Sequence, residues 1–234
     1  MSTPVNTNPG ETIAGLTKTD DKVTSLIDSH FAKPASAERI NAAKAGLEKN
    51  GFKVHVVDSK ASAFETLKNL IPQGASINNA HSTTLEEIGF ITYIKGETPW
   101  DNVHAKILTE KDPAKQAELR RTIGSTVDYY LTSVAAISET GELSHGDLSG
   151  SKVGGVAFGA GNVIIIAGSN KIVKDSHEAY QRITEHALPL ESARVRVAYG
   201  LPASNLVHYE VIRRVSPFNP NRVQVIIVNE ALGY

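Results

Sequence analysis

Cysteine is absent from the 234 residues of the chain. Its absence excludes disulfide bonds, cysteine nucleophiles, zinc fingers and iron–sulfur clusters held by the chain's own thiolates. A chain without disulfides suits a reducing compartment. We therefore expect a cytoplasmic protein.

Long apolar runs and a large excess of one charge are also missing. The longest apolar stretch, NVIIIAG over residues 162–168, is far shorter than the roughly 20 residues of a membrane-spanning helix. Residues 1–20 lack the basic and then apolar plan of a secretory signal, and their composition predicts a flexible segment. The net charge of -1 favours neither nucleic acid nor an anionic membrane as a partner. We therefore expect a soluble globular protein.

Several catalytic fingerprints are absent as well. The sequence holds no P-loop, no His-Glu-x-x-His and no Gly-x-Ser-x-Gly. The glycine-rich run GGVAFGAGN, residues 154–162, precedes an apolar strand, whereas a dinucleotide fingerprint follows a strand and opens a helix. An NAD site is therefore not expected, and the glycines are more typical of tight turns.

Helical and strand patterns alternate over the first part of the chain. The expected order is a helix from Ser36 to Asn50, a strand over residues 52–58, a helix with a capping box of Ser62 and Glu65 that stops at Pro72, a strand over residues 75–78, and a short helix over residues 82–90. This alternation predicts a layered α/β domain with a central, largely parallel sheet.

The second part of the chain continues with strands and two helices. The helices start at Asp112 and at Asp175, the latter with a capping box to Glu178. Strands are expected over residues 129–138, 151–159, 162–168 and 222–230. We expect one domain over residues 21–234, with its last strand near a sheet edge where it could support a homodimer.

The turn after the strand at residues 75–78 is the first candidate site. A strand there ends in polar residues and a helix begins at once, a position where parallel sheets bind ligands and helix starts bind anions. His81 can titrate near neutral pH, and Ser82 and Thr83 offer hydroxyls. The alternative is a simple capping box between Thr83 and Glu86.

The stretch AISETGELSHGDLSG, residues 136–150, is the second candidate. Glu139 follows an apolar strand, where a carboxylate could act as a nucleophile or general base. The alternative is an exposed hairpin turn, because Glu-Thr-Gly is ordinary turn chemistry. His145 and Asp147 could form a base or a metal pair, or lie in a solvated loop.

A third candidate follows the most apolar strand. Asn170 and Lys171 come at its end, and Arg182 lies in the next helix, so the two cations could bind a phosphate or carboxylate. The alternative for Lys171 is a side chain that extends along the sheet edge to water. His208 lies on an apolar background and is either a core residue or, with His81 and His145, part of a three-histidine site for a divalent metal.

Six segments resemble the LUD (lactate utilisation) domain family, which includes relatives of lactate utilisation protein C. They are STTLEEIGF, SVAAISETGEL, GSKVGGVAFGAGNVIIIAGSNKIVKD, EAYQRITEHALPLESAR, AYGLPASN and RVQVIIVNEALGY. They occur in the family's order and cover most of residues 38–234. The resemblance implies a fold like that of the NagB/RpiA/CoA-transferase superfamily and a role in the metabolism of lactate or another small carboxylate.

The resemblance also bears on Glu139. Some CoA-transferases carry their nucleophilic glutamate in Ser-Glu-Asn-Gly, and this chain has the similar Ser138-Glu139-Thr140-Gly141. The resemblance thus implies either a protein that binds a small organic anion, or an enzyme acting on a sugar phosphate or acyl-CoA by isomerisation, hydrolysis or acyl transfer. In the enzyme Glu139 would be the catalytic nucleophile, and His81 or His145 would move protons. Ser82, Thr83, Thr140, Asn170, Lys171 and Arg182 would contact the substrate.

Overall fold

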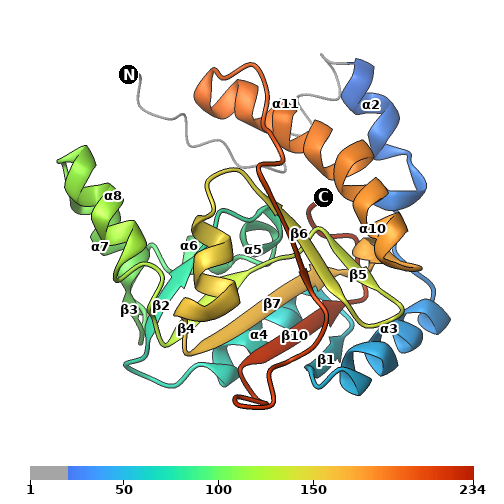
Figure 1. The fold of residues 1–234 in the computed structure, drawn as a ribbon, viewed down its shortest axis with the longest axis horizontal. Coiled ribbons are helices and arrows are strands. Elements are labelled where there is room, and N and C mark those ends of the chain that lie inside the picture. Colours follow the sequence, from blue (N-terminus) through green and yellow to red (C-terminus); the bar gives the residue numbers. More distant parts are fainter. Residues whose placement is uncertain (1–20) are drawn as a thin grey trace.

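Six parallel strands form the central sheet of the part of the chain that the structure describes, residues 21–234 (Figure 1). In this computed structural model the strand order is β1-β10-β7-β4-β2-β3, and each neighbouring pair is parallel. The strands are β1 Lys53–Val57, β2 Ser76–Asn79, β3 Asp101–Asn102, β4 Tyr129–Thr132, β7 Asn162–Gly168 and β10 Val223–Val228. The predicted layered α/β fold is confirmed. Residues 1–20, expected to be flexible, lie outside the described residues.

Both faces of the central sheet are buried. In β7 and β10 successive side chains point to opposite faces, so each strand contributes to two separate cores. One core holds Val163, Ile165, Val225 and Ile227, and the other holds Ile164, Ile166, Ile226 and Val228. Burial on both faces explains why these strands read as continuous apolar runs.

Helices cover the two faces of the sheet. They are α2 Asp21–Ile27, α3 Ala37–Lys49, α4 Lys60–Leu70, α5 Thr83–Glu87, α6 Phe90–Tyr93, α7 Val103–Thr109, α8 Pro113–Arg121, α9 Ser151–Gly154, α10 Ser176–Arg182 and α11 Leu188–Tyr199. Short 3₁₀ turns span η1 His30–Ala32 and η3 Ser169–Lys171, and π-helical turns span η2 Gly155–Gly159 and η4 Ile183–Ala187. No helix between residues 21 and 234 combines the length and apolar character that crossing a membrane requires.

A second, four-stranded sheet lies against α10 (Figure 1). Its order is β8-β5-β6-β9, and its strands are β5 Ala136–Ser138, β6 Leu143–Asp147, β8 Ile172–Val173 and β9 His208–Ile212. The single strand predicted over residues 129–138 is wrong, because β4 and β5 belong to different sheets. Between them the hydroxyl groups of Thr132 and Ser133 donate to the backbone carbonyls of Ser133 and Val134, which satisfies carbonyls outside the strand ladder.

The strand predicted over residues 151–159 is also wrong, since this segment forms α9 and the π-helical turn η2. A Cβ atom on Gly155 would lie 2.7 Å from the ring of Tyr130, and one on Gly159 would lie 2.3 Å from the carbonyl oxygen of Ser125. The glycines therefore allow a helical turn to lie directly against its neighbours.

Of the predicted capping boxes, two have their cap at another residue, and the third has its cap at Asp175 as predicted, although Glu178 accepts from the amide of Lys174 and not from that of Asp175. The hydroxyl of Ser59, not Ser62, caps α4, and Ser82, not Thr83, caps α5 by accepting from the amide of Leu85. Asp175 caps α10 as predicted, by accepting from the amides of His177 and Glu178.

The last strand does not lie at a sheet edge. β10 pairs with β1 on one side and with β7 on the other, so its backbone groups are already hydrogen-bonded. The edge position predicted for residues 222–230 is wrong, and β10 has no free edge for pairing with a strand of a second copy.

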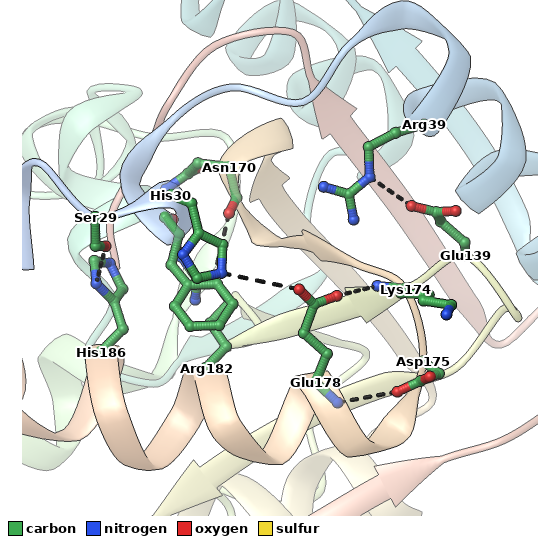
Figure 2. A network of polar contacts seen from close by, with 11 residues as sticks. Ser29, His30, Arg39, Glu139, Asn170, Lys174, Asp175, Glu178, Arg182 and His186 are labelled. Carbon is green, nitrogen blue, oxygen red and sulfur yellow. Dashed lines mark hydrogen bonds and ion pairs between the residues drawn. The ribbon is translucent and has the colours of Figure 1, made fainter.

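His186 is a buried polar group whose ring faces Ser29 (Figure 2). Its Nδ1 lies 3.1 Å from the hydroxyl of Ser29. Burial lowers the pKa of His186 to about 3, and the nearby cations Arg182, Lys171 and His30 act in the same direction. The ring is therefore neutral in the folded protein at neutral pH.

Acidification should destabilise the protein through His186. The pKa of His186 in the folded state lies below the unfolded value of about 6.5, so the unfolded state binds more protons between these two pKa values. The contribution of His186 to the free energy of unfolding is therefore fully present above about pH 6.5 and is lost as the pH falls toward 3. Between pH 7 and pH 5 the loss from this residue should be about 2 kcal/mol. Urea unfolding at both pH values measures it. A His186→Gln variant should lose about 2 kcal/mol less than the parent over the same interval, and an unchanged pH dependence would contradict this account.

Candidate functional site

A cavity of about 920 Å³ opens at the carboxyl ends of three central strands. Its wall includes the residues that follow β2, from Ala80 to Thr84, those that follow β4, from Ser133 to Ala135, and Lys171, which comes just after β7. The opposite side comes from β6, α9 and α11. Ligands of parallel α/β sheets collect at this end of the strands, where loops from several strands converge.

The charged residues of the cavity wall are mostly cations. Five are positive and three are negative, namely Lys95, Arg120, Lys152, Lys171 and Arg194 against Glu86, Asp147 and Glu191. Only Arg194 forms an ion pair with a carboxylate of the described residues, through Glu191 at 2.7 Å. The cavity wall therefore holds more basic than acidic side chains, and four of its five basic side chains lack an ion-pair partner among residues 21–234.

Lys171 is the most deeply buried of these cations, with 2% of its surface exposed. Its Nζ lies 3.0 Å from the hydroxyl of Thr84 and 3.1 Å from that of Ser133. Burial lowers the pKa of Lys171 well below its usual value, and Arg182 and Lys152 lower it further, while Glu87 opposes the shift. A buried lysine with this environment is typical of functional sites.

His145 and Glu210 form a pair that the sequence did not reveal. His145 is 1% exposed, and its Nε2 lies 2.9 Å from a carboxylate oxygen of Glu210 across the β6–β9 pairing. Burial lowers the pKa of His145, although Glu210 opposes this. No described residue hydrogen-bonds Nδ1, and the residue lines the cavity. The predicted solvated loop is wrong, because β6 carries this residue into the interior.

A network at the C-terminus of the chain closes another side of the cavity. The guanidinium group of Arg194 donates to both carboxylate oxygens of Glu191, at 2.8 and 2.7 Å, and the hydroxyl of Tyr234 donates to the same carboxylate. Burial alone would raise the pKa of Glu191, but hydrogen bonds from Arg194 and Tyr234 lower it. The spacing of Glu191 and Arg194 in one helix could have suggested their contact. Nothing in the sequence pointed to Tyr234.

The first predicted site residues lie in the cavity wall. His81, Ser82 and Thr83 all line it, and burial and Arg194 lower the pKa of His81 to about 4. The helix that follows, α5, has five residues. So short a helix has a weak dipole, and these residues would contact a ligand through their side chains.

Glu139 and Thr140 are not among the residues that line the cavity, and Figure 2 shows the side chain of Glu139 paired with Arg39. They form the turn of the β5–β6 hairpin, where the carboxylate of Glu139 accepts from Nε of Arg39 in α3 at 2.5 Å. The hydroxyl of Thr140 donates to Ser138. The structure therefore shows the hairpin turn that was the alternative to a catalytic role for this stretch.

Asn170 and Arg182 are buried and bind the protein's own backbone. The side chain of Asn170 contacts the amide of Leu232 and the carbonyl of Gly233. Arg182 donates to the backbone carbonyls of Asn170, Ala135 and Phe31 (Figure 2). Neither residue lines the cavity, so the expectation that both contact a ligand finds no support in the geometry.

The predicted three-histidine metal site is not formed. In the stretch from residue 21 to 234, no group of three or more His, Asp or Glu side chains is arranged to hold a metal ion. His81 and His145 line the cavity, but His208 does not. His208 lies opposite Asp147 in the β6–β9 ladder, with its ring against Gly150.

Comparison with known proteins gives one family match. Residues 40–228 match the model of the LUD domain. A crystal structure of a DUF162 family protein from Deinococcus radiodurans is 16% identical, with a TM-score of 0.47 over 83% of this chain and 99% of that one. No curated protein matches.

Proposed function

The chain belongs to the LUD domain family, and from this premise we propose that its cavity binds a small organic anion of carboxylate metabolism. The family's link to lactate utilisation proteins supports a carboxylate as the ligand. The proposal concerns the cavity at the carboxyl ends of β2, β4 and β7.

Four basic side chains of the cavity that lack an ion-pair partner among the described residues carry the proposal. Lys95 and Arg120 are exposed at its rim, while Lys152 is half-buried and Lys171 is buried. Within residues 21–234 none of these four side chains has a carboxylate at ion-pair distance, whereas Arg194 does. Burial disfavours a charge on Lys152, which Asp147, Glu191 and Glu210 favour from beyond ion-pair distance, and an anionic ligand would give this charge a direct partner.

The cavity also has room and hydrogen-bonding groups for a ligand larger than lactate. Its volume of about 920 Å³ is near the upper end of the range for ligand pockets. Hydroxyl groups of Ser82, Thr83 and Ser133 and the open Nδ1 of His145 line it. Sugar phosphates and acyl-CoA esters therefore belong in a ligand screen beside lactate and pyruvate.

Acyl transfer through Glu139 gains no support from this cavity. The glutamate does not line it, and its carboxylate already has a cationic partner in Arg39. We therefore give Glu139 no catalytic role in the proposal.

A thermal-shift screen with lactate, pyruvate, sugar phosphates and CoA esters tests the proposal. A ligand that binds the native state at about 100 times its Kd stabilises it by about 2.7 kcal/mol. For a chain of this size, that should raise Tm by roughly 5–10 °C. The rise should shrink as salt is added, because salt screens the cations at the rim.

Lys152→Met should weaken the binding of the best anion by roughly 10- to 100-fold, because one charged hydrogen bond of about 1.5–3 kcal/mol is lost. Lys174 is exposed and outside the cavity, so Lys174→Met is the matched control and should bind as the parent does. Isothermal titration calorimetry measures both. Equal affinity of all three proteins, or no stabilisation by any anion in the screen, would refute the proposal.

A further inference from the structure

We propose that the amine of Lys171 is a nucleophile that forms an imine with the carbonyl carbon of a 2-oxo acid bound in the cavity. The inference rests on the proposed function and deepens it, because it specifies the chemical class of the anion. It also assigns a covalent role to the one cavity lysine that is buried.

The hydrogen bonds around Nζ show how its protons are used. The hydroxyl of Thr84 donates its single proton to the carbonyl of Leu232, and the hydroxyl of Ser133 donates to the carbonyl of Val134. With these hydroxyl–carbonyl bonds, at 3.4 and 3.3 Å, both hydroxyl groups accept from Lys171, at 3.0 and 3.1 Å. These two bonds use both N–H groups of a neutral amine and leave its lone pair free.

A protonated Lys171 would be poorly accommodated. A third N–H group would lack an acceptor among residues 21–234, at a side chain that is 2% exposed. Arg182 and Lys152 disfavour a positive charge there, and Glu87 is the carboxylate that favours it. Burial and these two cations lower the pKa of Lys171 well below the usual lysine value. Such surroundings are those of lysines that form Schiff bases.

The cavity supplies what the reaction needs without another reactant. The lone pair of Nζ attacks the carbonyl carbon and forms a C–N bond. The two hydrogens of the amine then leave with the carbonyl oxygen as water, and a C=N bond remains. No electron is gained or lost overall. Lys152, which lines the same cavity, offers a counter-charge for the carboxylate of the 2-oxo acid.

Reductive trapping in the unaltered protein tests the inference. The protein is incubated at pH 7 with pyruvate, or separately with glyoxylate, and sodium cyanoborohydride, and the modified peptides are identified by mass spectrometry. We expect one reduced adduct at Lys171, with a yield at least about tenfold above that at Lys174, because an ordinary lysine with a pKa of about 10.4 is almost fully protonated at this pH. L-lactate, which has no carbonyl group, should give no adduct.

The variants Lys171→Met and Lys174→Met provide matched controls. The first should lose the adduct and the second should keep it. Peptide mapping in the unaltered protein decides the question even if Lys171→Met does not fold. Failure of both 2-oxo acids to label Lys171, or equal labelling of many lysines, would overturn the inference. If pyruvate raises Tm but leaves no adduct, the anion-binding function stands and the covalent step falls. If no anion stabilises the protein, the proposed function itself falls.

Discussion

Arg182→Met should lower the free energy of unfolding by about 3–5 kcal/mol. Arg182 is 0% exposed and donates to three backbone carbonyls, those of Asn170, Ala135 and Phe31 (Figure 2). Methionine fills similar space but leaves the three carbonyls without a donor in the interior. Phe31 lies in η1, Ala135 in the segment between β4 and β5, and Asn170 in η3. Loss of the three hydrogen bonds from Arg182 should therefore loosen the elements around Lys171 as well.

Thermal and urea unfolding measure this effect. A Tm decrease of roughly 6–20 °C corresponds to the expected loss in a protein of this size. Arg213→Met is the control, because the side chain of Arg213 is 76% exposed and its ion pair with Glu142 lies at the surface. The control should change stability by about 0.5 kcal/mol or less. A similar effect of the two substitutions would mean that Arg182 does not join these elements.

Gly141→Ala should be at least as damaging, with an expected loss of about 4 kcal/mol or more. The φ angle of Gly141 is +90°, a region that side chains with a Cβ rarely adopt. An added Cβ would also lie 2.1 Å from the carbonyl oxygen of Gly46 in α3. Because the oxygen at this contact belongs to the backbone and cannot rotate away, the hairpin and the helix would have to separate.

Gly74→Ala isolates the contribution of the backbone angle. Gly74 has a similar φ of +82°, but an added Cβ would meet nothing within 4 Å. The Gly74→Ala substitution should lower the free energy of unfolding by only about 1 kcal/mol. Chemical unfolding of the Gly141→Ala and Gly74→Ala variants gives the difference between their losses in unfolding free energy. This difference is the part of the Gly141→Ala effect that the contact between the hairpin and α3 causes. Equal losses would show that this close approach is absent in solution.

The contact between Gly141 and Gly46 also explains the stretch Ser138-Glu139-Thr140-Gly141. Its likeness to a nucleophile motif rested on four residues, and the structure accounts for them by local needs. The glycine turns the hairpin, Ser138 accepts from the amide of Glu142, and Glu139 pairs with Arg39. A short motif could not distinguish these roles from catalysis.

The parallel sheet could be predicted because its signals are local. The alternation of helices with strands and the doubly buried runs of β7 and β10 follow from the periodicity and composition of neighbouring residues. The caps of α4 and α5 were displaced because Ser and Thr occur several times near each helix start, and the choice depends on where the first turn packs.

The smaller sheet and much of the site depend on contacts between distant residues. Residues 129–138 contain no glycine, proline or charged residue, so no strong local signal marks the passage from one sheet to the other at residues 133–135. The pairing of His145 with Glu210 depends on the register of β6 with β9. Lys171 was found because it follows the most apolar strand, and the carboxyl end of such a strand is a common ligand site.

A crystal structure of the protein with the most stabilising anion of the screen tests the central claim most directly, namely that the basic side chains of the cavity hold the ligand. We expect the anionic group of the ligand inside the cavity, within about 4 Å of the Nζ atom of Lys152 or Lys171. A saturating ligand found elsewhere on the molecule, for instance beside Arg39 and Glu139, would contradict the account.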